Sequence, residues 1–138
     1  MNKFIVQAFI LLIIDRLLKA LAMAGFASDT WFKLFLNDGI IFSLPFNNLL
    51  TIILTTLIIL IVVYWLVRSW PQKKYKLTFA YLLIFIGSAS NLFDRIIYSS
   101  VIDYFNFSYW PVFNLSDVYI VLGIILLLKI KLKPRLNI

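Results

Sequence analysis

The sequence of 138 residues contains no cysteine and no histidine. These two absences exclude disulfides, thiol nucleophiles, catalytic triads built on histidine and the usual zinc ligand sets. Glutamate is absent as well, so all six acidic side chains are aspartates: Asp15, Asp29, Asp38, Asp94, Asp103 and Asp117. Acid–base chemistry near neutral pH must therefore depend on aspartate. We expect neither a metal ion nor a cofactor.

Charge of any kind is also scarce. Only 14% of residues are charged, against roughly 25% in soluble domains, while 63% are hydrophobic and the mean hydropathy is +0.98. The sequence therefore predicts an integral membrane protein in which residues 1–138 form one domain. The net charge of +7 could suggest nucleic acid in a soluble protein, but here the basic residues flank apolar runs. Membrane orientation and lipid headgroups explain them better, and we expect no nucleic-acid partner.

Four apolar runs predict an all-α protein with four transmembrane helices, because each span needs about 20 residues. The predicted spans are about 4–24, 49–67, 77–97 and 115–132. The third and fourth reach this length only if polar residues near Asn91 and Asp117 are included. Polar side chains at membrane depth are costly and usually functional.

Loop charge predicts the orientation of these helices. The segments 68–76 and 129–138 each carry four basic residues and no acidic one, whereas the connections 25–48 and 98–114 carry one basic residue against three aspartates. Both termini should therefore be cytoplasmic, with both longer connections outside. Aromatic residues and the turn sequence "NDG" at 37–39 predict a small extracytoplasmic β-structure between the first and second helices.

Charged residues within the predicted spans can be structural or functional. Asp15 and Lys19 are four residues apart, which places them on one helix face as an ion pair; Arg16 would extend outward to the headgroups. Alternatively, Asp15 contacts a substrate. Asp94 and Arg95 could neutralise each other or pair with Asp15 and Lys19 across helices, and direct catalysis by Asp94 is the less favoured alternative.

Two further aspartates flank an aromatic segment between the last two predicted helices. Asn114 and Asp117 have the spacing of a capping box, so Asp117 could simply stabilise a helix start, and Asp103 could be a loop carboxylate facing water. However, both should lie where the third and fourth spans reach the outer surface. Two neighbouring carboxylates share a proton and supply one general base and one general acid, which allows water to attack an amide without histidine, cysteine or metal.

Five short motifs, in order, resemble the lipoprotein signal peptidase (signal peptidase II) family over nearly the whole chain. "DRLLK" at 15–19 is similar to its D-x-x-x-K motif, "NDGIIFS" at 37–43 to N-x-G-x-x-F, and "GSASNLFDR" at 87–95 to G-x-x-x-N-x-x-D-R. "VIDYF" at 101–105 and "FNLSD" at 113–117 resemble the two segments that carry the catalytic aspartates. The chain departs from the family pattern at a few positions, among them Ser90, Tyr104 and Ser116.

The resemblance implies an intramembrane aspartic endopeptidase of the bacterial inner membrane, active near the extracytoplasmic face. Its substrate would be a diacylglyceryl-modified prolipoprotein, cut just before the lipidated Cys, and we expect a monomer surrounded by membrane lipid. The implied catalytic pair is Asp103 and Asp117. The implied substrate-binding or supporting residues are Asp15, Lys19, Asn37, Gly39, Asn91, Asp94, Arg95 and Asn114.

Two other classes of function remain as alternatives. Intramembrane Asp, Lys and Arg residues could line the pathway of a small transporter, although the sequence shows no clear pseudo-symmetric halves or interrupted helices. The chain could also be a structural assembly subunit, in which Asp103 would tolerate replacement by Asn. Release of a peptide from a lipidated substrate would distinguish a peptidase from both.

Overall fold

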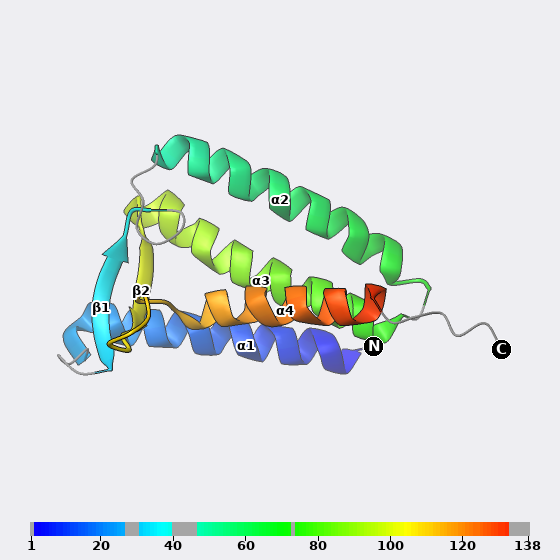
Figure 1. Cartoon of the computed structure of the whole chain (residues 1–138), viewed down its shortest axis with the longest axis horizontal. Coiled ribbons are helices and arrows are strands. Elements are labelled where there is room, and N and C mark those ends of the chain that lie inside the picture. The colour runs from blue at the N-terminus through cyan, green and yellow to red at the C-terminus, as the bar shows by residue number, and fades with distance from the viewer. Residues whose placement is uncertain (1, 27–30, 40–46, 73, 133–138) are drawn as a thin grey trace.

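The computed structural model describes residues 2–26, 31–39, 47–72 and 74–132, and it consists of four long helices with a small sheet at one end (Figure 1). In chain order the elements are α1 (Asn2–Leu21), η1 (Ala22–Phe26), β1 (Phe32–Asn37), α2 (Asn48–Ser69), α3 (Tyr75–Tyr98), β2 (Val101–Phe105) and α4 (Leu115–Lys131). Each predicted apolar run is helical, with ends close to the predicted ones. Figure 1 shows the sheet lying across one end of the bundle.

Two of these helices are long and apolar enough to cross a membrane within the described part of the chain. They are α2, with a hydropathy of 2.8, and α3, with 1.4. By contrast, α4 has 17 residues, about 26 Å at 1.5 Å per residue against a hydrocarbon core of about 30 Å. α1 carries Asp15, Arg16 and Lys19 in its second half. Length and composition alone therefore assign two spans.

The centre of the bundle is α3, which packs against α1, α2 and α4. Its buried residues Leu82, Leu83 and Ile86 form a core with Ala8 and Tyr119. In α2 most large apolar side chains are exposed, Leu49 by 65% and Leu60 by 59%. An apolar surface of this extent suits contact with lipid.

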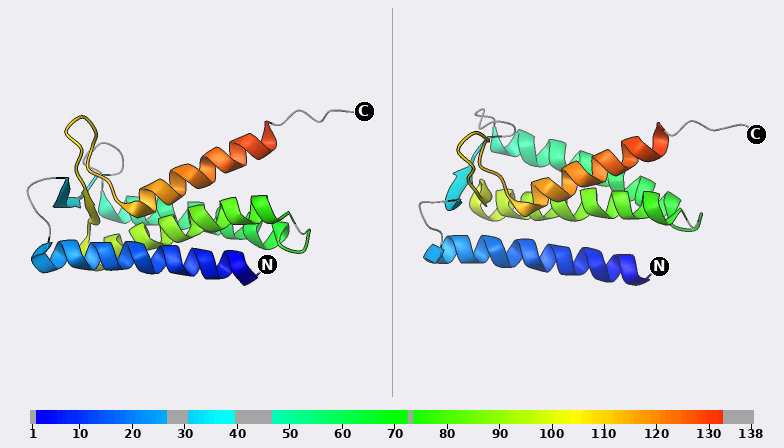
Figure 2. Two further views of the ribbon diagram at one scale, coloured as in Figure 1. Left: turned by 90° about the horizontal axis from the view of Figure 1, so that it is seen from below. Right: turned by 60° about the horizontal axis from the view of Figure 1, so that its bottom comes forward.

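Two glycines set how closely α3 and α4 approach. A Cβ on Gly87 would lie 2.4 Å from the Ser116 carbonyl oxygen, and one on Gly123 would lie 2.8 Å from that of Ala80. The absence of side chains at these positions brings the start of α4 directly against α3. Towards its C-terminal end α4 diverges from α1 and α3, as both views in Figure 2 show.

The β-structure differs from the sequence prediction. β1 does lie between the first two long helices, but its antiparallel partner is β2, which lies between α3 and α4. Phe35 is opposite Asp103, and Asn37 is opposite Val101. Residues 40–46, which would form the other side of the predicted "NDG" turn, lie outside the described residues. The prediction was incomplete because a turn sequence indicates only local pairing, whereas these strands are far apart in the chain.

Candidate active site

Asp103 lies in the middle of β2 and is held by two side-chain amides. It is only 1% exposed. Asn37 of β1 donates a hydrogen bond from Nδ2 to Asp103 Oδ2 at 2.8 Å, and Asn114 donates from Nδ2 to Oδ1 at 2.6 Å. Ser99, the C-cap of α3, has a left-handed backbone with φ of 58°, which turns the chain from α3 towards β2. The alternative that Asp103 is a loop carboxylate facing water is wrong, because the side chain is enclosed.

Asp117 lies in the first turn of α4 and is partly exposed. Its Oδ2 accepts a hydrogen bond from the Asn114 backbone at 3.2 Å, and its own backbone N–H donates to Asn114 Oδ1 at 3.0 Å. The predicted capping box is therefore confirmed. The Asp117 side chain also has a contact outside the capping box, because Asn91 of α3 donates from Nδ2 to Asp117 Oδ1 at 2.8 Å.

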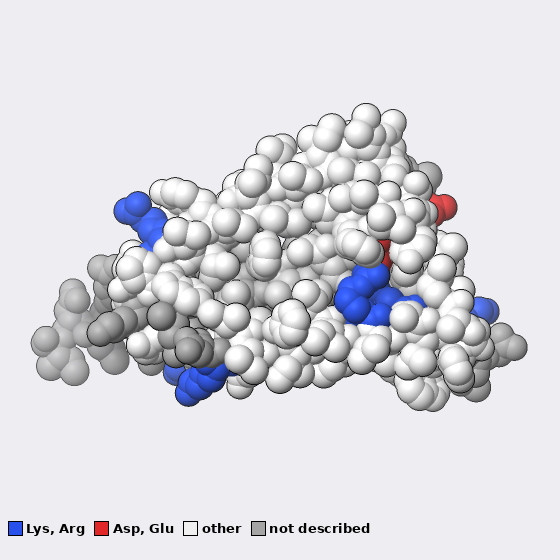
Figure 3. All heavy atoms as spheres, turned by 180° about the vertical axis from the view of Figure 1, so that it is seen from behind, with Lys and Arg blue, Asp and Glu red and all other residues white. Residues whose placement is uncertain are grey.

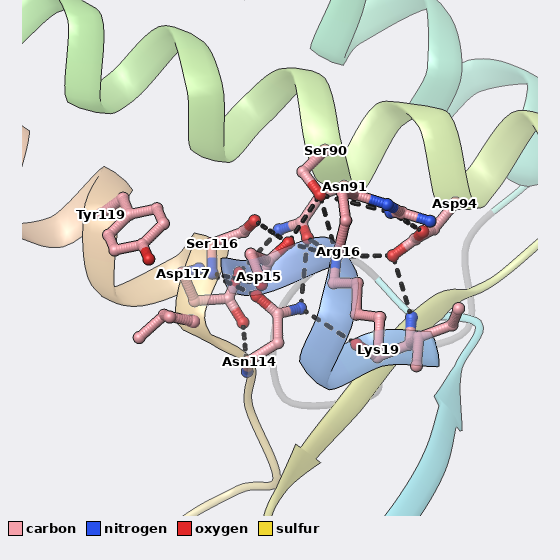
Figure 4. A network of polar contacts seen from close by, with 12 residues as sticks. Asp15, Arg16, Lys19, Ser90, Asn91, Asp94, Asn114, Ser116, Asp117 and Tyr119 are labelled. Carbon is pink, nitrogen blue, oxygen red and sulfur yellow. Dashed lines mark hydrogen bonds and ion pairs between the residues drawn. The ribbon is translucent and has the colours of Figure 1, made fainter. Parts of the chain in front are cut away.

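Asn114 connects the two aspartates directly. Its side-chain nitrogen contacts Asp103, while its side-chain oxygen and backbone nitrogen contact Asp117. The side-chain nitrogen of Asn114 also donates a hydrogen bond to Asn91 Oδ1 at 3.1 Å. Figure 4 shows Asn91, Asn114 and Asp117 in this network. Asn114 thus donates to both carboxylates, from its side-chain amide to Asp103 and from its backbone N–H to Asp117.

The electrostatic environment favours a proton on Asp103. The pKa of Asp103 is raised to about 7, mainly by burial and secondly by the nearby charge of Asp117, although the hydrogen bonds from Asn37 and Asn114 act in the opposite direction. Among the described residues, no Lys or Arg forms an ion pair with Asp103 or Asp117. Because side-chain amides carry no charge, they hold both carboxylates in position without neutralising their negative charge.

Arg95 and Gly39 lie next to this pair. Arg95 Nη2 donates to the Gly39 carbonyl oxygen at 2.6 Å, and Gly39 N–H donates to Asn37 Oδ1 at 3.0 Å. Arg95 Nη1 is buried and has no hydrogen-bond partner among the described residues. Of the predicted pairings, Asp94 with Lys19 across the helices is confirmed, whereas Arg95 pairs with neither Asp94 nor Asp15 among the described residues. Successive residues of a helix point about 100° apart, so Asp94 and Arg95 face different neighbours.

A second cluster of charges lies between α1 and α3. Lys19 is fully buried and forms ion pairs with Asp94 at 2.6 Å and with Asp15 at 3.4 Å, which confirms the predicted Asp15–Lys19 pair. Lys19 also donates to Asn91 Oδ1 at 2.9 Å and so links this cluster to Asp117. Arg16 does not extend outward as predicted: it pairs with Asp94 and stacks over the Phe93 ring at 4.7 Å.

Sequence reasoning missed the hydroxyl groups around Asp15. Ser90 and Ser116 donate to Asp15 Oδ2 at 2.6 and 2.7 Å, and Tyr104 donates to Oδ1 at 3.1 Å. The Ser116 backbone N–H adds a bond at 3.1 Å. Asp15 therefore ties α1 to α3, β2 and α4. The only signal in the sequence was that all three hydroxyls stand at departures from the family pattern.

The chain is similar to many lipoprotein signal peptidases. It is 30% identical over 133 residues to that of Moorella thermoacetica, covering 90% of this chain and 89% of the relative, and 32% identical over 147 residues to that of Thermodesulfovibrio yellowstonii, covering 93% of each. A match to the Dichelobacter nodosus protein is 41% identical but spans only about half of each chain, 54% and 53%.

The fold is similar to solved structures as well. Two structures, each described as a bacterial membrane enzyme, have TM-scores of 0.82 and 0.78 at 23% and 21% identity; they cover 99% and 96% of this chain, and the matches take in 92% and 94% of those chains. The family model for signal peptidase (SPase) II matches residues 7–132, which include Asp103, Asp117 and the charged cluster between α1 and α3. On this match and on the two nearly full-length relatives, the chain belongs to the signal peptidase II family.

Proposed function

We propose that Asp103 and Asp117 are the catalytic pair with which this protein cuts diacylglyceryl-modified prolipoproteins just before the lipidated Cys. As a member of its family, the protein is a protease of a bacterial membrane that removes signal peptides from prolipoproteins. The observation that carries the catalytic assignment is the shared contact with Asn114, which joins two carboxylates that form no ion pair within the described part of the chain. Membership of the signal peptidase II family favours this role over the transporter and assembly-subunit alternatives.

Charge balance supports one shared proton. In the cluster between α1 and α3, Asp15 and Asp94 are balanced by Arg16 and Lys19. Arg95 interacts electrostatically with Asp103 and Asp117, and one negative charge shared by the pair would balance it; Asp38, which also interacts with Arg95, is exposed to water. A doubly ionised pair would leave an uncompensated charge in a poorly solvated site, which is costly.

The environments of the two carboxylates suggest their roles. Asp117 is the more exposed and would remove a proton from the attacking water, while Asp103, whose pKa is raised to about 7, would donate its proton to the carbonyl oxygen of the scissile amide. Water oxygen then bonds to the carbonyl carbon. When this tetrahedral intermediate collapses, the C–N bond breaks and the proton held by Asp117 passes to the leaving amine. The proton that Asp103 donated to the carbonyl oxygen returns to Asp103.

Neighbouring residues are suited to holding the substrate. Arg95 Nη1, which has no partner within the described part of the chain, could donate to a substrate carbonyl, and Asn37 at the end of β1 and Gly39 just beyond it lie on the same side. An apolar groove of about 480 Å³ adjoins the sheet and is suited to acyl chains; it is lined by Leu18, Leu21, Phe26, Trp31, Phe32 and Phe105. These contacts support a lipidated peptide as substrate.

We also propose that all four long helices span the membrane, with both termini cytoplasmic and the sheet outside. Support comes from the excess of Lys and Arg in 68–76 and 129–138 over the other two connections. Reporter fusions test this topology. A periplasmic phosphatase should be inactive when fused at Gln72 and active at Asn47; activity at Gln72 would overturn it.

Replacement of Asp117 by Asn tests the catalytic assignment. Asn and Asp are about equally good N-terminal helix residues, so Asp117→Asn should preserve the fold but remove the exchangeable proton. We expect cleavage of a lipidated prolipoprotein peptide to be abolished while the melting temperature in detergent stays close to that of wild type. A folded Asp117→Asn protein that cleaves at near the wild-type rate would leave capping as the only role of Asp117.

A further inference from the structure

The end of the bundle opposite the sheet contains a large groove between α1, α3 and α4. Its volume is about 900 Å³, and its lining residues are Phe4 of α1, Lys74 and Tyr75–Leu77 and Phe79 around the start of α3, and Leu126, Lys129 and Ile130 of α4. The divergence of α4 from α1 and α3 towards its C-terminal end opens this space (Figure 2). A volume of this size is typical of sites that bind small molecules.

The rim of the groove is basic although its walls are apolar. Lys74, Lys76 and Lys129 line it and are exposed. Apolar walls alone are ordinary in a membrane protein, but three lysines around one hollow are not explained by contact with acyl chains. The N-terminus of α3 lies at the same rim, and its helix dipole adds positive potential.

No carboxylate side chain balances these lysines. All six aspartates lie within 15–38 or 94–117, so none belongs to the segments that form this end of the bundle. On the face in Figure 3, acidic atoms appear only towards the opposite end. The buried ion pairs use Arg16 and Lys19, which leaves Lys74, Lys76 and Lys129 without an ion-pair partner among the described residues.

We propose that this groove binds one anionic phospholipid of the surrounding bilayer, such as phosphatidylglycerol, separately from the catalytic pair. The phosphate would lie among Lys74, Lys76 and Lys129, and an acyl chain would pack along Phe4, Phe79 and Leu126. Charge complementarity selects this occupant over others. Residues 133–138 carry Lys133 and Arg135, so the chain's own tail would be repelled by the rim. Basic pockets between membrane helices bind anionic headgroups by the same chemistry.

Native mass spectrometry of the delipidated full-length protein in detergent tests this site. The protein is titrated with phosphatidylglycerol or with phosphatidylcholine, and the lipid adducts are counted. Wild type should bind one phosphatidylglycerol at least tenfold more tightly than phosphatidylcholine, since each lysine near an anionic lipid changes affinity by roughly fivefold. Equal binding of the two lipids would overturn the proposal, as would a lysine-dependent dimer in place of a lipid adduct.

Two variants separate the groove from general surface charge. Replacing Lys74, Lys76 and Lys129 with Gln should remove the preference for phosphatidylglycerol, whereas the matched triple replacement of Lys33, Arg68 and Lys131 with Gln should retain it. If both triples lost the preference equally, bulk charge would explain it and the site would be rejected.

Ile130→Trp keeps the charge but fills the hollow, and it should weaken binding about tenfold or more. Unchanged binding by Ile130→Trp would also reject the site, provided that its melting temperature confirms folding.

Discussion

Buried carboxylates occur in two adjoining clusters, and their neighbours differ in kind. Asp15 and Asp94 are surrounded by cations, hydroxyls and a backbone amide, and Lys19 forms ion pairs with both. Asp103 and Asp117 are contacted by the amides of Asn37, Asn91 and Asn114. Asn91 belongs to both clusters, because it accepts from Lys19 and donates to Asp117.

This difference separates a structural role from a chemical one. A carboxylate that is paired with a buried cation joins the elements that carry the two groups, and breaking the pair leaves an unpaired charge in the interior. A carboxylate that is held by neutral amides keeps its position but can gain and lose a proton. The cluster around Lys19 therefore joins α1 to α3, whereas the cluster around Asn114 holds the two carboxylates to which we assign proton transfer.

The largest expected effect comes from removing the proton-exchanging groups. Asp103→Asn and Asp117→Asn should each reduce the rate of cleavage by on the order of 10⁴-fold, and the double variant should be little worse than either, because residues that act as one unit are not additive. The measurement is single-turnover cleavage of a lipidated peptide. Losses that multiplied in the double variant would show that the two aspartates act independently.

Breaking the structural cluster should mainly affect stability. Lys19→Met leaves Asp15 without a cation and Asp94 with Arg16 alone, so we expect a loss of about 3–5 kcal/mol in the free energy of unfolding. Arg16→Met is the control, because the Arg16 side chain is 30% exposed and water can replace part of its contact. Thermal melts in detergent compare the two. Equal and small losses would mean that the cluster contributes little.

A series of thermal melts at different pH values tests the raised pKa of Asp103. The folded-state pKa of Asp103 is about 7, above its ordinary value of 3.8, so its contribution to stability is complete below about pH 4 and is lost as the pH rises through 7. A shift of about three pKa units corresponds to at most about 4 kcal/mol. The melting temperature of wild type should fall between pH 4 and 7.5, and that of Asp103→Asn should fall less.

The same titration should appear in the activity. If protonated Asp103 is the general acid, kcat/KM should decline above about pH 7 as this proton is lost from the free enzyme. If kcat/KM instead rose steadily from pH 6 to pH 9, protonated Asp103 would not be the general acid, and the roles assigned to Asp103 and Asp117 would have to be exchanged.

The smallest effect is expected for a hydroxyl at the edge of the structural cluster. Tyr104→Phe removes the bond from the hydroxyl to Asp15 at 3.1 Å and the bond that it accepts from the Leu115 backbone at 3.0 Å. Two hydrogen bonds of this kind contribute about 1–3 kcal/mol together. Asp15 keeps its bonds to Ser90 and Ser116, so cleavage should persist. Tyr109→Phe, at a fully exposed position, should melt like wild type.

The sequence predicted the helices well because their signal is local. Apolar runs mark α1 to α4, and the spacing of Asp15 and Lys19 places both on one helix face. The Asn114–Asp117 capping box was equally readable, since it depends on residues three positions apart. The motif resemblance brought Asn37, Gly39, Asn91 and Arg95 into the candidate site, and all four do lie around Asp103 and Asp117.

Contacts between distant elements were not predictable in the same way. The pairing of β1 with β2 joins two connections on either side of α2 and α3, and nothing near "NDG" specifies that partner. The contacts of Arg16 depend on how α1 is rotated against α3, which places Asp94 and Phe93 beside it. The convergence of three hydroxyls on Asp15 requires α3, β2 and α4 to be in place at once.

The position of Asp15 has a consequence for biosynthesis. Asp15 is made early and contacts Ser116, which follows it by 101 residues, and Asp103 is likewise made before Asp117. A chain whose synthesis has stopped before α4 therefore contains one carboxylate of the pair and half of the network that positions it. If Asp103 and Asp117 are the catalytic pair, as we propose, a nascent or truncated chain that lacks α4 should have no proteolytic activity towards neighbouring peptides.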